Sequence, residues 1–411
     1  MGRSAAAAFA LVAALAVTGC GNDVDNGVSG DAPSDTSVLT VYVSLPGKGP
    51  NQAWGDAIAR GINLAQSDAK GVAGGKTIKL KRLDDTGPDG VWDDGQVADN
   101  AREAVRDKST IAYIGELESG ASALSIPILN EAGVLQVSPA SGYAGLTRNA
   151  GFVQGEPDKY YPSGRRNFAR ILPGDDVEAA AQVQLQSQRA CTSLHIFYDE
   201  ELYGTGLAKS TRDAAKKASI VVAGETAFEP GGKDYTALGE QIADDPPDCA
   251  FVGVSDIKSA VLVWRALHQA APEMKLFGPA LLVNPSFTSR LGGAGRLTFL
   301  TSPVLRRSDY PASSRAVLRK YAEQYGAPAP MATLYGYATM QAILGAIDNA
   351  SGSGSLQRRT IRSFFDSDHD SVIGRFSIND DGDSSLSRYG AYTVIGGEPH
   401  FDRVIETKSS P

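Results

Sequence analysis

The chain of 411 residues has few of the side chains that build metal centres, with three cysteines and four histidines. The histidines lie too far apart for the short ligand spacings of a zinc site: His195, His268, His369 and His400. The sequence also lacks a Gly-x-Ser-x-Gly elbow, a P-loop and a Gly-x-Gly-x-x-Gly signature. We therefore expect no catalytic residues, no metal and no cofactor, and we expect that the protein is not an enzyme.

The sequence also has fewer positively charged than negatively charged residues. The chain has 39 Lys and Arg residues against 47 Asp and Glu residues, a formal net charge of −8. This balance argues against the basic face that nucleic-acid binding requires, so we expect no nucleic-acid partner. Apolar residues make up 42% and charged residues 21%, which is typical of a globular chain, and the length suits about two domains.

A short apolar run opens the chain. Residues 4–19 follow Arg3 and are too few for a comfortable membrane span, which is typical of a signal peptide. The run ends in Val17-Thr18-Gly19-Cys20, which resembles the lipobox of bacterial lipoproteins, whose cysteine is diacylated and becomes the new N-terminus. The resemblance implies a lipoprotein signal peptide over residues 1–19 and a lipid on Cys20. The alternative is an ordinary secretory signal that happens to contain a cysteine.

The next segment has the composition of a linker. Residues 21–37 contain four Asp, no Lys or Arg, and many Gly, Ser and Asn residues. We expect residues 20–37 to form the acylated cysteine and a flexible tether. The protein would then be extracytoplasmic, anchored to the cell membrane by the lipid on Cys20.

The remaining chain alternates between strand and helix patterns. Short apolar or alternating segments at 38–44, 77–83, 111–115 and 134–139 are separated by helical patterns, and a second such series begins near residue 174. This alternation predicts an α/β fold with two doubly wound parallel-sheet lobes and a ligand cleft between them. We expect lobe 1 to comprise residues 38–158 and 284–385, and lobe 2 to comprise residues 159–283 and 386–411. The chain would cross between the lobes near 156–172, near 280–285 and near the C-terminal strands.

Two cysteines open strands of the second series. Cys191 precedes the strand segment SLHIFYD, and Cys249 opens the segment CAFVGV. Neighbouring parallel strands would bring their starts within the separation that a disulfide needs. With Cys20 acylated, these are the remaining thiols in an oxidising compartment, so we predict a Cys191–Cys249 disulfide. Two buried free cysteines that merely pack in the core are the alternative.

Several segments in order resemble one family. They are AWGDAIARGINLA, IGELESGASALSIPILNEAGVLQVSPASGYAGLT, FYDEELYGTGLAKS, ATLYGYATMQAILGAID and VIGRFSINDDGD. They are similar to segments of the Leu/Ile/Val-binding proteins, the type I substrate-binding components of ABC importers, and they span nearly the whole mature chain.

The resemblance implies a set of ligand-binding residues. Ser119 matches the serine that holds the ligand α-carboxylate, and its expected place at a helix N-terminus favours an anion. Ser141 and Gly142 match a loop with further carboxylate donors, although the family usually has Thr at the place of Gly142. The list is completed by aromatic residues from opposite lobes and by residues at a strand end: Trp54, Tyr203, Leu117 and Glu118.

The resemblance also implies an acidic residue that receives a ligand ammonium group. The family places a Glu shortly after the strand that matches CAFVGV, and here Asp256 lies nearby with Lys258 close to the expected place. Asp256 would supply the charge for an α-amino acid. If Lys258 points inward instead, the ligand is not an α-amino acid, because an unpaired buried charge is costly.

The resemblance implies a function with two variants. The first is a substrate-binding lipoprotein that delivers an amino acid or related carboxylate to the permease subunits of an ABC importer. The second is a ligand-sensing protein on the same fold that signals to a membrane partner. Fold alone does not separate them.

Overall fold

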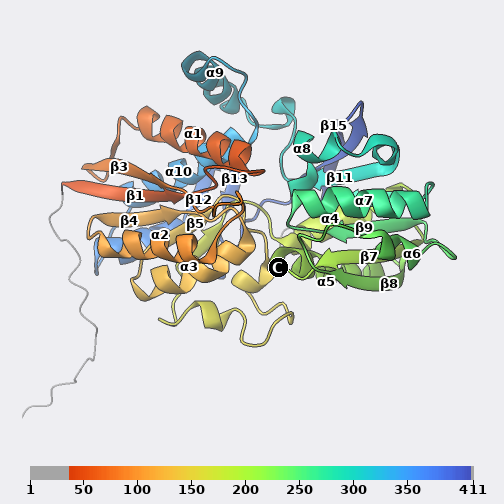
Figure 1. The fold of residues 1–411 in the computed structure, drawn as a ribbon. Helices are drawn as coiled ribbons and strands as arrows, with labels where there is room; N and C mark the ends of the chain where they lie inside the picture. Colours follow the sequence, from red (N-terminus) through yellow and green to blue (C-terminus); the bar gives the residue numbers. More distant parts are fainter. Residues whose placement is uncertain (1–36, 409–411) are drawn as a thin grey trace, which may run out of the picture. The chain divides into compact units, whose positions relative to one another are not determined.

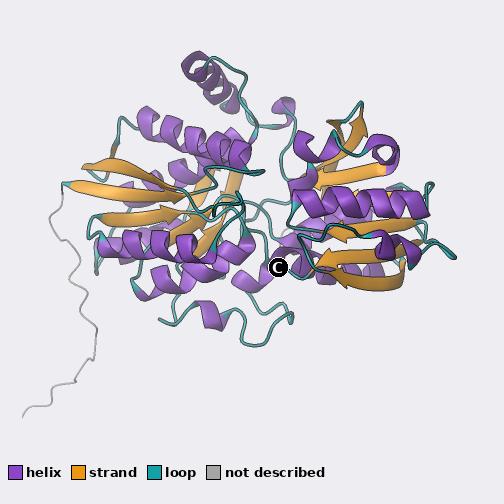
Figure 2. Ribbon diagram, in the orientation of Figure 1, coloured by secondary structure: helices purple, strands orange, loops and turns teal. Residues whose placement is uncertain are grey.

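The computed structural model describes residues 37–408, which belong to one compact unit. The expected signal peptide, Cys20 and all but the last residue of the expected tether lie outside these residues. Two large sheets with helices on both faces make up the described chain, and each forms a lobe with its own core (Figures 1 and 2).

The first sheet contains six of the described strands, in the order β2-β3-β1-β4-β5-β6. All its neighbouring strands are parallel except β2 and β3. Its strands are β1 Val38–Ser44, β2 Val72–Ala73, β3 Lys76–Leu83, β4 Thr110–Ile114, β5 Leu135–Ser138 and β6 Phe168–Arg170. Its helices are α1 Gln52–Asp68, α2 Asp94–Arg106, α3 Ser119–Glu131, α9 Ser314–Tyr325, α10 Ala332–Asp348 and α11 Leu356–Phe365.

Side-chain alternation along β1 explains the two cores of this lobe. Val41 and Val43 join one cluster with residues of α1 and α10, whereas Tyr42 joins the other with residues of α2 and α3. Figure 1 accordingly shows α1 and α2 on opposite sides of the sheet. A small hairpin of β12 Asp368–Ser371 and β13 Gly374–Ser377 adds Phe376 to the first cluster.

The second sheet contains seven of the described strands, in the order β15-β14-β11-β10-β9-β7-β8. Its strands are β7 Ser193–Asp199, β8 Val221–Phe228, β9 Cys249–Gly253, β10 Lys275–Gly278, β11 Thr298–Ser302, β14 Arg388–Ile395 and β15 Glu398–Glu406. Its neighbouring strands are parallel, except that β14 is antiparallel to both of its neighbours, β11 and β15. Its helices are α4 Asp175–Gln188, α5 Leu202–Lys217, α6 Thr236–Glu240, α7 Ile257–Ala270 and α8 Pro285–Thr288.

The sheets correct two of the expected lobe boundaries. Strand β6 pairs with β5 in the first sheet, so lobe 1 extends through Arg170 rather than ending at residue 158. Strand β11 pairs with β10 in the second sheet, so the second crossing follows Ser302 rather than residue 283. An apolar run shows that a strand exists but not which strand it pairs with. The third crossing precedes β14.

The predicted disulfide is confirmed. Cys191 and Cys249 are bonded, with their Cα atoms 5.9 Å apart. Strand β9 pairs in parallel with β7, with Cys249 opposite Leu194, and this register brings Cys191, which lies just before β7, next to its partner. Both residues are buried in the core between the sheet and helices α4 and α5.

A search of residues 37–408 for a membrane-crossing helix finds none that is both long and apolar enough.

Candidate functional site

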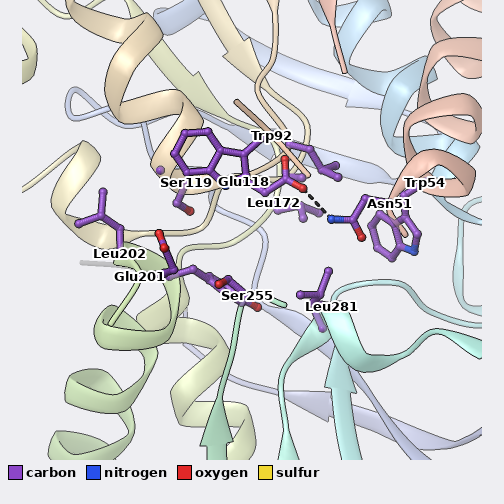
Figure 3. Close-up of a pocket in the computed structure, with 15 residues that line it drawn as sticks. Asn51, Trp54, Trp92, Glu118, Ser119, Leu172, Glu201, Leu202, Ser255 and Leu281 are labelled. Carbon is purple, nitrogen blue, oxygen red and sulfur yellow. Dashed lines mark hydrogen bonds between the residues drawn. The ribbon is translucent and has the colours of Figure 1, made fainter. Parts of the chain in front are cut away.

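A cavity lies where both lobes present the carboxyl ends of their strands, the usual ligand position in open α/β sheets (Figure 3). It holds about 720 Å³ of space free of protein atoms, including solvent at its mouth. The first lobe contributes Asn51, Trp54, Trp92, Leu117, Glu118, Ser119, Gly120, Ala140 and Leu172. The second lobe contributes Glu201, Leu202, Tyr203, Ser255, Ala280 and Leu281. The lining therefore includes five of the ligand-binding residues expected from the sequence: Trp54, Leu117, Glu118, Ser119 and Tyr203.

Helix α3 points its N-terminus into this cavity. It begins at Ser119, and Glu118 occupies the N-cap position without a side-chain capping bond, so Ser119 is the first helical residue rather than the cap. The Ser119 hydroxyl oxygen accepts a hydrogen bond from the Tyr143 backbone N–H at 3.2 Å, which leaves its O–H free to donate. The first N–H groups of a helix have no partner within it. Together these donors and the helix dipole suit a carboxylate.

Glu118 brings a carboxyl group to the same place. Its Oε1 accepts a 2.7 Å hydrogen bond from Asn51 Nδ2, which ties the start of α1 to the start of α3 (Figure 3). Burial raises the pKa of the Glu118 carboxyl to about 7, although the bond from Asn51 acts in the opposite direction. The group therefore changes charge near neutral pH.

Aromatic side chains form the walls. Trp54 lies on α1, and Trp92 comes from the loop after β3. A Cβ atom on Gly120 would overlap the Trp92 ring, so the absence of a side chain there lets the indole pack on the first turn of α3. The hydroxyl group of Tyr203, a residue of α5, donates a hydrogen bond to Glu178 Oε2 at 3.4 Å. Glu178 Oε1 in turn accepts the backbone N–H of Ala280 at 2.7 Å, which links two parts of the wall.

A family model described as periplasmic binding protein matches residues 40–383. The chain belongs to the periplasmic binding protein family. The Leu/Ile/Val-binding protein BraC3 of Rhizobium johnstonii is 25% identical over 373 residues, which cover 89% of this chain and 94% of that protein.

Solved structures of similar proteins share the fold. A leucine-binding protein from Thermotoga maritima matches with a TM-score of 0.76 at 21% identity, over 90% of this chain and 99% of the other. An ABC transporter solute-binding protein from R. palustris in complex with benzoate matches with a TM-score of 0.72 at 16% identity, over 91% of this chain and 98% of the other. The predicted type I fold with two α/β lobes is thus confirmed.

In this periplasmic binding protein, Ser141 and Gly142 lie behind the cavity and not in its lining. The Ser141 hydroxyl contacts Ser122 Oγ at 2.7 Å and donates to the carbonyl oxygen of Glu116 at 3.1 Å. A Cβ atom on Gly142 would overlap the carboxyl group of buried Asp175, so Asp175 occupies the space of the expected Thr side chain. The prediction that this loop lines the pocket needs correction, because both residues are used inside the protein.

The prediction that Asp256 faces the ligand also needs correction. Its carboxylate caps α7, accepting the backbone N–H of Ser259 at 2.7 Å and the Ser259 hydroxyl at 2.6 Å. Lys258 is exposed, and neither residue lines the cavity. Ser255 lies there instead, with its hydroxyl donating to Asp199 at 2.6 Å. Aspartate is a preferred N-cap residue, and the Asp256 carboxylate is used for capping α7 instead of for lining the ligand site.

Sequence reasoning missed four polar or aromatic lining residues. Asn51 and Glu201 are the residues just before α1 and α5, Trp92 lies in a loop rich in Gly and Asp, and Ser255 follows β9. The available signal was their position, since each follows the carboxyl end of a predicted strand. Among residues 37–408, no group of three or more His, Cys, Asp or Glu side chains is arranged to hold a metal ion.

Proposed function

We propose that this protein is the substrate-binding component of an ABC importer, and that its cavity binds a small amino-acid-like solute. The supporting observation is the N-terminus of α3, with the free Ser119 O–H, in a cavity lined by both lobes and walled by Trp54, Trp92 and Tyr203. Free helix N–H groups suit a carboxylate, and the aromatic walls suit an apolar body. Related proteins named for leucine or solved with benzoate share the carboxylate as a ligand feature.

Titration calorimetry against amino acids, amides, ureas and small organic acids tests this function. We expect at least one carboxylate-bearing solute to bind with micromolar or tighter affinity. Uptake of that solute by cells with and without the gene then separates an importer from the alternative of a sensor, since only the importer role predicts lost uptake. Absence of binding by every solute in the screen contradicts the proposal.

The first prediction concerns the Ser119 hydroxyl. We expect Ser119→Ala to weaken the best carboxylate ligand tenfold or more, because a hydrogen bond to a charged group contributes roughly 1.5–3 kcal/mol. Titration calorimetry gives the affinity, and Ser187→Ala is the matched control because Ser187 is an exposed helical serine on α4 that does not line the cavity. Wild-type affinity in Ser119→Ala removes Ser119 from the binding site.

The second prediction concerns the membrane anchor. We propose that Cys20 carries the lipid and forms the mature N-terminus, on the strength of the apolar run that ends at Gly19-Cys20. Mass spectrometry of protein extracted from membranes should find a diacylated Cys20, and Cys20→Ser should release the protein from the membrane fraction. A mature N-terminus elsewhere contradicts the anchor.

A further inference from the structure

The charges around the cavity are one-sided. Two carboxyl groups line it, Glu118 from the first lobe and Glu201 from the second, and both are partly buried. No lysine, arginine or histidine from the described part of the chain is among its lining residues. The ionised cavity therefore carries two negative charges that no lining side chain balances.

The region around Glu118 has acceptors in excess. Asn51 donates to Glu118 Oε1, but Glu118 Oε2 and Asn51 Oδ1 are both shielded from solvent and lack a hydrogen-bond partner in the described structure. Figure 3 shows these two side chains turned toward each other on the first-lobe wall of the cavity, joined by that hydrogen bond. Unsatisfied buried acceptors are rare and costly, and two of them side by side suit a ligand with several N–H donors.

Glu201 adds a second free carboxyl group. It occupies the N-cap position of α5 but makes no side-chain capping bond. Figure 3 shows its carboxyl group on the side of the cavity where Ser119 lies. Burial and the nearby charge of Asp94, at the start of α2, both raise the pKa of Glu201.

The groups behind these two carboxyls are acidic as well. Asp85 and Glu116 lie behind Glu118. Burial is the main reason that the pKa of Asp85 is raised to about 10 and the pKa of Glu116 to about 7. Asp199 lies near Glu201, and burial raises its pKa to about 6. With its raised pKa, Asp85 is protonated near pH 7 and adds no charge, so a simple anion would meet chiefly the charges of Glu118 and Glu201, with only the N-terminus of α3 to hold it.

We propose that the cavity selects a small solute with net positive charge, and that Glu118 and Glu201 receive its ammonium, amidinium or guanidinium group. The inference rests on the proposed function, because it names the charge class of the solute that the same cavity binds. A basic amino acid carries one group for each part of the site: a carboxylate for α3 and Ser119, a cation for the carboxyl groups, and methylenes for the aromatic walls.

Binding of a cation is then linked to proton release. A cation stabilises the ionised carboxylate, and burial holds the pKa of Glu118 at about 7 in the empty protein. Binding of the cationic solute should therefore release protons near pH 7. The affinity for the cationic solute should rise between pH 6 and pH 8, because Glu118 is then already ionised before the solute binds.

Matched solutes isolate the charge. Titration calorimetry at pH 8 compares L-arginine with L-citrulline, and L-lysine with L-norleucine, since each pair differs mainly in one positive charge. We expect the cationic member to bind at least tenfold tighter in at least one pair. Repeating the titration in buffers of different ionisation enthalpy should show net proton release at pH 7 for that solute.

Matched variants isolate the two carboxyls. Glu118→Gln should weaken the cationic solute at least tenfold and leave its uncharged analogue within about threefold, and Glu201→Gln should act in the same direction. Glu131→Gln, at the exposed end of α3, and Glu200→Gln, the exposed neighbour of Glu201, should bind as wild type.

The outcomes separate this inference from the proposed function. Equal or tighter binding of the uncharged analogues, proton uptake on binding, or wild-type discrimination in Glu118→Gln overturns the inference and leaves a solute-binding protein. Binding of another solute in the screen without binding of any cationic probe has the same effect. Failure of every solute overturns both.

Discussion

Asp383→Asn is expected to reduce the free energy of unfolding by about 3–5 kcal/mol, because it leaves a buried guanidinium without its counter-charge. Asp383 Oδ1 lies 2.9 Å from Arg170 Nε, and the two side chains are 2% and 0% exposed. Arg170 also donates to the carbonyl oxygen of Tyr143 at 3.0 Å and to Thr147 Oγ1 at 2.7 Å. The pair thus fastens the end of β6 to the loop behind the ligand cavity and to the segment before β14.

Urea denaturation followed by circular dichroism measures this loss. Asp381→Asn is the matched control, since Asp381 is 46% exposed and lies 3.7 Å from Arg166, a surface geometry that contributes at most about 1 kcal/mol. Replacing both members, as Arg170→Met with Asp383→Leu, should recover part of the stability because no charge is then left unpaired. Equal and small losses in Asp383→Asn and Asp381→Asn would show that the buried pair does not stabilise the fold.

Removal of the disulfide is expected to have a similar effect. Cys191 and Cys249 are separated by 58 residues, and a closed loop of that length corresponds to about 4 kcal/mol in the chain-entropy model. Both side chains are buried, so Cys191→Ala with Cys249→Ala also leaves unfilled space in the core beside α4 and α5. We expect the double variant to lose about 2–5 kcal/mol of stability and to unfold at a clearly lower temperature.

Reductant provides the control for this experiment. Dithiothreitol should lower the unfolding temperature of the wild type toward that of the double variant, and should leave the double variant unchanged. Labelling of the denatured, non-reduced wild type should find neither Cys191 nor Cys249 reactive. Two reactive thiols, or coincident unfolding of variant and wild type, would contradict a stabilising bridge.

Local patterns in the sequence determined which segments form strands and helices, and with them the α/β fold. Residues 38–44 form β1, and the helix expected from Ser119 forms α3, because apolar periodicity and helix starts depend on neighbours along the chain. The disulfide followed from the same information, since both cysteines stand at the starts of strands that prove adjacent. The five lining residues foreseen came from a family resemblance at strand ends.

Only the tertiary structure decided what depends on distant partners. Strand β11 belongs to the second lobe because of its pairing with β10 and β14, which its five residues do not reveal. Asp256 is drawn into capping α7, whereas Glu118 and Glu201, at N-cap positions without capping bonds, remain free to line the cavity. A carboxyl group at the same helical position thus caps a helix in one place and lines the cavity in another, because burial, hydrogen-bond partners and nearby charge come from segments far away in the sequence.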